Sequence, residues 1–210
     1  MKAWISEKIS KPWRKIRRPA ADWLHLISHL GANLPLLIML WDFWRGNLGP
    51  NPILELTHRT GMTALILLML SLAVSPLRKI LNWPQIGKLR RPLGLYSFAY
   101  AAAHFAIFLG LDYGFNWSLI PRAFLERPFA LIGFASMLIL LMLAVTSWNV
   151  LVKKLGKRWK VLHRLVYLAG VLAALHFIMA VKPGVLRPWY YAAGMLLLLV
   201  YRIPAVRKRL

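Results

Sequence analysis

The chain has 210 residues, of which 59% are hydrophobic, and it carries a formal net charge of +22. Such an apolar composition excludes an ordinary soluble domain, and basic clusters that alternate with apolar runs indicate loops beside anionic lipid rather than a nucleic-acid-binding surface. The sequence contains no cysteine, which excludes disulfides, thiolate metal sites, iron–sulfur clusters and a covalently attached c-type haem.

Six apolar segments are each close to the roughly 20 residues that a helix needs to cross the hydrocarbon core of a bilayer. Gaps containing proline and glycine, such as GNLGPNP at 46–52 and KPG at 182–184, separate them. We therefore predict an all-α integral membrane protein, a bundle of six transmembrane helices. The predicted spans are 24–44, 57–76, 93–111, 128–148, 161–181 and 189–204.

Lysine and arginine residues gather at alternate ends of these spans. If the N-terminus is inside the cell, 22 of the 28 basic residues lie on the inner side and six on the outer side. An excess of this kind marks the cytoplasmic side of a membrane protein. We therefore expect both termini to be cytoplasmic, with 1–22 as a basic N-terminal segment and 205–210 as a basic tail. The first apolar run is long and has no convincing small-residue cleavage site, so we expect a span rather than a secretory signal.

The first two spans carry polar residues near their ends. His25 is expected to be a solvated interfacial residue, whereas His29 is a candidate metal ligand. His58 and Arg59 open the second span on the outer side, where a positive charge suits a quinone headgroup, an anionic cofactor group or a docking partner. The alternative is a polar helix entrance capped by Thr57.

His104 in the third span and His176 in the fifth lie at nearly equal depth. At 1.5 Å per residue they are roughly 10 Å and 9 Å from the outer ends of their helices. Alanine and glycine residues surround both, which leaves room for a porphyrin. One histidine from each of two antiparallel helices is the arrangement of a bis-imidazole haem, so we predict that they are its axial ligands. The alternative is that the small residues only permit close helix packing and that each histidine bonds a neighbour.

His163 lies near the inner end of the fifth span, 13 residues and about 20 Å from His176 along the helix axis. A second haem would fit this rise, but the third span has Arg91 at the corresponding inner position. A second haem would then need another partner, such as His29, or a single axial ligand. Alternatively, His163 is an interfacial histidine that bonds a carbonyl group or a lipid phosphate.

Several motifs together resemble the MsrQ (YedZ) family, the haem-binding membrane subunits of the bacterial periplasmic methionine sulfoxide reductase system, and more broadly the ferric-reductase-like transmembrane domain. The resemblance runs from about residue 24 onward. The motifs are HLGANLPLL at 29–37, THRTGMTAL at 57–65, RRPLGL at 90–95, LGKRWKVLHRLVYL at 155–168, and the single His104 and His176.

The resemblance implies a haem b protein of the bacterial inner membrane, with 23–204 as the haem domain. It implies electron transfer from the cytoplasmic side to the periplasmic molybdopterin reductase MsrP, which repairs oxidised methionine. The implied electron donor is the quinone pool or a cytoplasmic flavin reductase, and FMN is an implied cofactor. His104, His163 and His176 match the haem-linked histidines of the family, while Arg91 replaces an inner histidine of the wider family. The resemblance thus implies one haem and leaves a second one open. His58 and Arg59 would lie where a haem propionate could be bound.

Two other classes of function stay open at this point. One is a stand-alone transmembrane ferric or quinone reductase, and the other is a non-redox transporter or scaffold whose histidines are structural. The sequence shows no nucleotide-binding motif and no evident internal repeat. Matched intramembrane histidines without a substrate motif favour an electron-transfer subunit that has no catalytic residues of its own.

Overall fold

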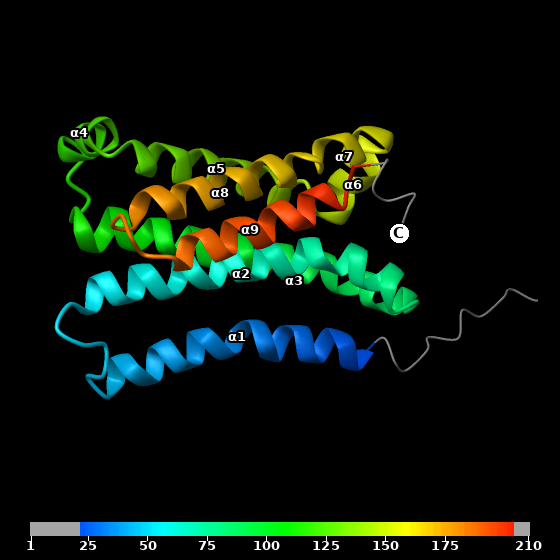
Figure 1. The fold of residues 1–210 in the computed structure, drawn as a ribbon, viewed down its shortest axis with the longest axis horizontal. Helices are drawn as coiled ribbons and strands as arrows, with labels where there is room; N and C mark the ends of the chain where they lie inside the picture. The colour runs from blue at the N-terminus through cyan, green and yellow to red at the C-terminus, as the bar shows by residue number, and fades with distance from the viewer. Residues whose placement is uncertain (1–21, 204–210) are drawn as a thin grey trace, which may run out of the picture.

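The computed structural model describes residues 22–203, and every regular element in this range is helical (Figure 1). The all-α prediction is therefore confirmed for the described residues. The longer helices are α1 (Asp22–Trp44), α2 (Pro52–Ile80), α3 (Arg90–Ile107), α5 (Pro128–Val145), α8 (Leu165–Ala180) and α9 (Arg187–Val200). The shorter ones are η2 (Pro84–Leu89), η3 (Phe108–Asp112), α4 (Leu119–Glu126), α6 (Asn149–Leu155) and α7 (Lys157–Leu162).

Five helical segments within 22–203 are long and apolar enough to cross a membrane, and they correspond to the first five predicted spans. They comprise Trp23–Trp44, Pro52–Ile80, Pro84–Asp112, Pro128–Val145 and Lys157–Ala180. The sixth predicted span corresponds to α9, which has only 14 residues. Because a perpendicular crossing takes roughly 20 residues, α9 alone does not meet the length criterion.

Proline fixes where several of the helices begin. Pro52, Pro128 and Pro188 each stand in the first turn, where the missing N–H removes no helical hydrogen bond. At α2 the side chain of Asn51 also accepts a hydrogen bond of 3.0 Å from the amide of Leu54, which caps the helix.

The fifth predicted span is interrupted in the structure. Helix α7 ends at Leu162 and α8 begins at Leu165, so His163 and Arg164 lie between two helices rather than inside one. Upstream, Gly156 has a φ of 51°, a conformation that favours glycine, and it separates α6 from α7. The sequence analysis also missed α4, a short amphipathic helix between α3 and α5.

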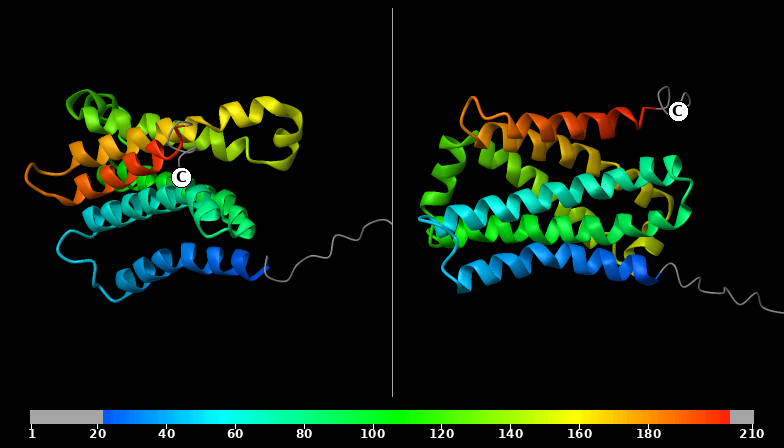
Figure 2. Two further views of the ribbon diagram at one scale, coloured as in Figure 1. Left: turned by 45° about the vertical axis from the view of Figure 1, so that its right-hand side comes forward. Right: turned by 60° about the horizontal axis from the view of Figure 1, so that its bottom comes forward.

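The helices form two closely packed antiparallel pairs, α2 with α3 and α5 with α8. α9 packs against α8 and α2, and α1 lies on the flank of the bundle against α3, η2 and α2 (Figure 2). A buried core that includes Leu68 and Leu72 of α2, Ala169 of α8 and Met195 of α9 joins the pairs. The start of α1 and the end of α9 lie at the same end of the bundle (Figure 1), which we call the inner end. The opposite end, with the start of α2 and the end of α3, is the outer end.

α1 is anchored to α3 at an internal proline. Pro35 has no amide hydrogen to continue the helical ladder. The hydroxyl of Tyr100 enters the ladder one residue later: it accepts a hydrogen bond of 3.0 Å from the amide of Leu36 and donates one of 2.7 Å to the carbonyl of Ala32. A side chain inserted in this way satisfies the opened backbone and fixes the register between α1 and α3.

Candidate haem site

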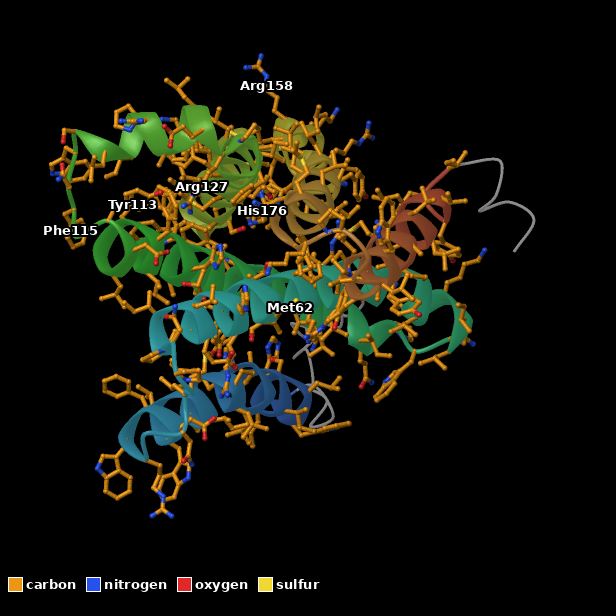
Figure 3. The ribbon with its side chains drawn as sticks, turned by 60° about the vertical axis from the view of Figure 1, so that its left-hand side comes forward. Met62, Tyr113, Phe115, Arg127, Arg158 and His176 are labelled. Atoms are coloured by element: carbon orange, nitrogen blue, oxygen red, sulfur yellow. The ribbon has the colours of Figure 1, made fainter. Side chains whose placement is uncertain are left out.

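His104 of α3 and His176 of α8 face each other toward the outer end of the bundle. Their ring centroids are 6.0 Å apart and their ring planes are nearly perpendicular, at 84°. Figure 3 shows His176 in the space between α8 and α3. We call these two residues the histidine pair. The structure thus brings together the two residues that the sequence placed at equal depth, although 72 positions separate them in the chain.

Backbone carbonyls fix the protonation of both rings. Nδ1 of His104 lies 2.8 Å from the carbonyl oxygen of Thr57, and Nδ1 of His176 lies 2.7 Å from that of Phe129. A carbonyl oxygen only accepts, so each Nδ1 carries the hydrogen and donates it. Each Nε2 therefore keeps a lone pair, and neither has a hydrogen-bond partner among residues 22–203. Metal-binding histidines are oriented by the same bond from the non-ligating nitrogen.

Each ring lies directly against a glycine of the neighbouring helix. A Cβ atom added to Gly61 of α2 would be 3.0 Å from ring atoms of His104, and one added to Gly133 of α5 would be 2.6 Å from Nδ1 of His176. Both distances are below normal van der Waals contact. Glycine is therefore needed at both positions for the rings to occupy the places that the structure gives them.

The two helix pairs present the same set of groups in the same register. The carbonyl acceptor, the glycine and the histidine are Thr57, Gly61 and His104 in the first pair. The corresponding residues of the second pair, Phe129, Gly133 and His176, each lie 72 positions later. A buried serine also bonds a carbonyl across each pair: Ser97 donates to Ala64 at 2.8 Å and Ser136 donates to Ala169 at 2.9 Å. These positions also differ by 72, with donor and acceptor exchanged. The structure therefore reveals an internal repeat that the sequence analysis missed, and the shared glycine-to-histidine spacing is the signal that could have revealed it.

The donor set and its geometry fit a haem. In the described part of the chain no group of three or more His, Cys, Asp or Glu side chains could hold a bare metal ion. A metal bound by the histidine pair must therefore take its other ligands from elsewhere, as a porphyrin iron does. The ring centroids of His104 and His176 are 6.0 Å apart, close enough for both imidazoles to reach one metal atom.

A cluster of aromatic side chains joins α3, η3, α4 and α5. Phe105 of α3 and Phe134 of α5 have ring centroids 5.2 Å apart. Phe124 of α4 lies 5.5 Å from Phe134 and 6.0 Å from Phe108 of η3. Tyr113 continues this cluster at 4.8 Å from Phe108. The short helix α4, which the sequence analysis missed, thus contributes Phe124 to this aromatic cluster.

Neither of the outer candidates, His58 and Arg59, forms a hydrogen bond with the histidine pair among the described residues. Arg59 donates a hydrogen bond of 2.6 Å to Glu55 and also forms an ion pair with Asp42 of α1. Two carboxylates therefore engage its charge, while His58 is exposed.

The inner candidate His163 has other neighbours. Its Nε2 lies 3.2 Å from the hydroxyl of Thr146, and its ring stacks on Trp159 at 3.9 Å between centroids. Arg91 bonds the carbonyl of Ser147 and, at 2.9 Å, the side chain of Asn149. No second imidazole packs against His163 within residues 22–203, so the structure does not assemble an inner histidine pair.

His29 lies on α1 and contacts α3 instead of the histidine pair. Its Nδ1 is 2.9 Å from the hydroxyl of Tyr96, and the rings pack edge to face. Of the histidines proposed from the sequence as ligands, only His104 and His176 are therefore placed face to face.

Comparisons with known proteins show which family the chain belongs to. The family described as ferric reductase like transmembrane component matches residues 60–174, which contain most of both helix pairs. The chain is 46% identical over 168 residues to the protein-methionine-sulfoxide reductase haem-binding subunit MsrQ of Deinococcus radiodurans, covering 79% of this chain and 82% of the relative. It is 39% identical over 183 residues to the MsrQ of Xanthomonas axonopodis pv. citri (strain 306), covering 84% of each chain.

Proposed function

This chain belongs to the ferric-reductase-like transmembrane family and, within it, to the MsrQ haem-binding subunits, and we propose on this premise that it carries electrons across a membrane to a methionine sulfoxide reductase. The observation that carries the proposal is the histidine pair, two imidazoles 6.0 Å apart with both Nε2 lone pairs free. A bound haem supplies an iron that takes up and releases single electrons.

In this proposal His104 and His176 would hold one haem b through their Nε2 atoms. Thr57 and Phe129 keep both rings in the tautomer that ligation requires. His163 serves electron entry at the inner end, where FMN or another anionic group would meet basic residues. His58 and Arg59 form the polar rim at the outer end.

We propose six membrane crossings with both termini in the cytoplasm of a bacterium, in its inner membrane. Because α1 begins and α9 ends at the same end of the bundle, the number of crossings must be even if α1 crosses (Figure 1). We assign the returning span to α9, whose short length would require neighbouring residues or a locally thinner bilayer to complete the crossing.

We propose that the partner at the outer end is the periplasmic reductase MsrP. The electron donor at the inner side is then the quinone pool or a cytoplasmic flavin reductase. The names of the two relatives state haem binding and a methionine sulfoxide reductase. The placement of the histidine pair toward the outer end supports this direction of transfer, because it would bring the haem close to an acceptor on that side.

The test uses the full-length chain purified with haem. We expect a low-spin spectrum, and we expect the chemically reduced protein to be reoxidised only when both the periplasmic reductase and methionine sulfoxide are present. His104→Ala is the matched control, because it removes one ligand from the pair.

Two results would contradict the proposal. Fast reoxidation by ferric chelates, with no dependence on the reductase, would indicate a stand-alone ferric reductase. A protein that takes up no haem in cells or in reconstitution would indicate a non-redox membrane protein.

A further inference from the structure

A polar network crosses from α1 to α3 in the inner half of the bundle. It consists of His29 and Asn33 of α1 and Tyr96 of α3, and we call it the His29–Tyr96 network. Nδ1 of His29 and Nδ2 of Asn33 lie 2.9 Å and 2.8 Å from the hydroxyl of Tyr96. His29 follows the start of α1 by seven residues, about 10 Å along its axis. A cluster of this polarity inside a bilayer is a candidate functional site.

The contacts determine where the hydrogens of this network lie. Nδ2 of Asn33 is also 2.8 Å from the carbonyl oxygen of His29, which can only accept, so this atom is the amide nitrogen. Tyr96 therefore accepts a hydrogen bond from Asn33. Nδ1 of His29 is the one acceptor that the described residues offer to the Tyr96 hydroxyl hydrogen, so we assign this hydrogen to the bond with Nδ1 and the proton of His29 to Nε2.

Two groups of the network are left without protein partners in the described part of the chain. They are the Nε2–H donor of His29 and the Oδ1 acceptor of Asn33, on either side of the Tyr96 hydroxyl. His29 is exposed, and its neighbours Leu26 and Leu30 are 59% and 62% exposed, so this face of α1 meets lipid. In a bilayer an unpaired donor is costly, so a ligand that offers oxygen atoms would be stabilised here.

We propose that the His29–Tyr96 network binds the headgroup of a lipid-soluble quinol or quinone, which enters from the bilayer between α1 and α3. A ring oxygen can accept from Nε2–H of His29, and a quinol hydroxyl can in addition donate to Oδ1 of Asn33. The ligand has to be neutral and dissolved in lipid, because the network holds no cation to bind an anion. The proposal rests on the proposed electron-transfer function and names where one of its donors binds.

The position of the network relative to the histidine pair fits this role. Tyr96 and His104 lie on the same helix eight residues apart, about 12 Å along the axis. The anchor of Tyr100 in the backbone of α1 holds the two helices in register at this level. Toward the inner end, where α1 contacts η2, the rings of Trp23 and Trp83 pack with their centroids 6.1 Å apart.

The test is photoaffinity labelling of the full-length protein in nanodiscs with an azido-quinone, followed by mapping of the labelled peptide. We expect labelling of α1 or α3 near His29 or Tyr96, and competition by unlabelled quinone. His29→Leu and Tyr96→Phe should each weaken binding roughly three- to tenfold, the effect of losing one or two hydrogen bonds. Tyr96→Phe keeps the ring and its packing, and His25→Leu, one turn earlier on α1, should leave labelling unchanged.

Three outcomes would overturn the inference. Labelling that maps elsewhere, labelling that is equal in all variants, or competition by excess phospholipid as strong as competition by quinone would each show that the network does not recognise quinones. The haem spectrum and its reoxidation by the periplasmic reductase are measured on the same samples. If these are normal while labelling fails, electron transfer stands and its donor binds at another place.

Discussion

The chemistry of the histidine pair depends on single atoms around each ring. The Nδ1–H bonds to Thr57 and Phe129 select the tautomer that leaves Nε2 free, and a hydrogen bond from the non-ligating nitrogen also makes the imidazole a better ligand. Both acceptors are backbone carbonyls, so no side chain at 57 or 129 identifies them. Substitution of either residue would leave the carbonyl in place, which makes the tautomer robust.

Replacing either member of the pair is the most direct residue-scale prediction. His104→Ala and His176→Ala should each abolish the low-spin spectrum and lower the haem content. Loss of a hydrogen-bond partner of a metal ligand lowers metal affinity ~10–100-fold, and loss of the ligand itself should lower haem affinity by more than this. Visible spectroscopy and a haem-to-protein ratio measure this. His25→Ala should keep the full spectrum. The ligand assignment is wrong if both alanine variants retain low-spin haem at normal content.

The glycine behind His176 gives a second residue-scale prediction. A Cβ at Gly133 would lie 2.6 Å from Nδ1 of His176, so Gly133→Ala should push the ring aside and strain its bond to Phe129. We expect lower haem content and a thermal unfolding midpoint reduced by several degrees, as overpacking costs about 1–3 kcal/mol. Gly31→Ala is the matched control, because a Cβ there has nothing within 4 Å. Equal haem content in the two variants would show that the ring tolerates the added methyl group.

Depth and helix direction were enough to predict from the sequence that His104 and His176 could meet. The residues that support them could not be predicted in the same way, because backbone acceptors have no sequence signature and Gly61 and Gly133 resemble ordinary small residues of membrane helices. For His29 the sequence indicated a metal ligand, but the structure places it beside Tyr96, a contact that depends on how α1 docks on α3.

At the scale of elements, the apolar runs predicted where the long helices lie, and the all-helical fold follows from them. Side-chain hydrogen bonds and segment length explain where the observed helices differ from the predicted spans. Helix α5 ends at Val145 because the hydroxyls of Thr146 and Ser147 bond back to the last turn. The amphipathic α4 was missed because eight residues in a loop are too short to be recognised by hydropathy.

The break between α7 and α8 leads to a prediction for His163. Its contacts are the Thr146 hydroxyl and the Trp159 ring, both at the inner end. His163→Ala should therefore leave the spectrum and content of the haem bound by the histidine pair unchanged, while slowing its reduction by a cytoplasmic donor. Loss of the hydrogen bond and ring stacking should cost about 1–2 kcal/mol of stability.

Haem quantification and stopped-flow reduction of the His163 variant decide the outcome. Trp159→Phe, which retains an aromatic ring, serves as a control for simple loss of packing. A fall of haem content to half would show instead that His163 ligates a second haem.

At the scale of the whole molecule, acidic and basic side chains gather at opposite ends of the bundle. The described acidic side chains Asp42, Glu55, Asp112 and Glu126 all lie at or beyond the outer ends of their helices. The inner ends carry basic residues, including Arg91, which bonds the α5–α6 connection. Because anionic lipid attracts juxtamembrane cations on the cytoplasmic side, this distribution predicts that the inner end faces the cytoplasm. In that orientation the histidine pair would lie on the side away from the cytoplasm.

The orientation yields the prediction on which the direction of electron transfer depends. A fluorescent reporter fused after Leu210 should be active in the cytoplasm, whereas alkaline phosphatase fused there should be inactive. Insertion of the phosphatase near Gly49, in the connection between α1 and α2, should give an active enzyme, because that connection lies at the outer end. An active phosphatase after Leu210 together with an inactive one near Gly49 would invert the bundle and place the histidine pair near the cytoplasm. Activity at both sites would mean that α9 does not cross, since an even number of spans is needed to return the chain to the inner side.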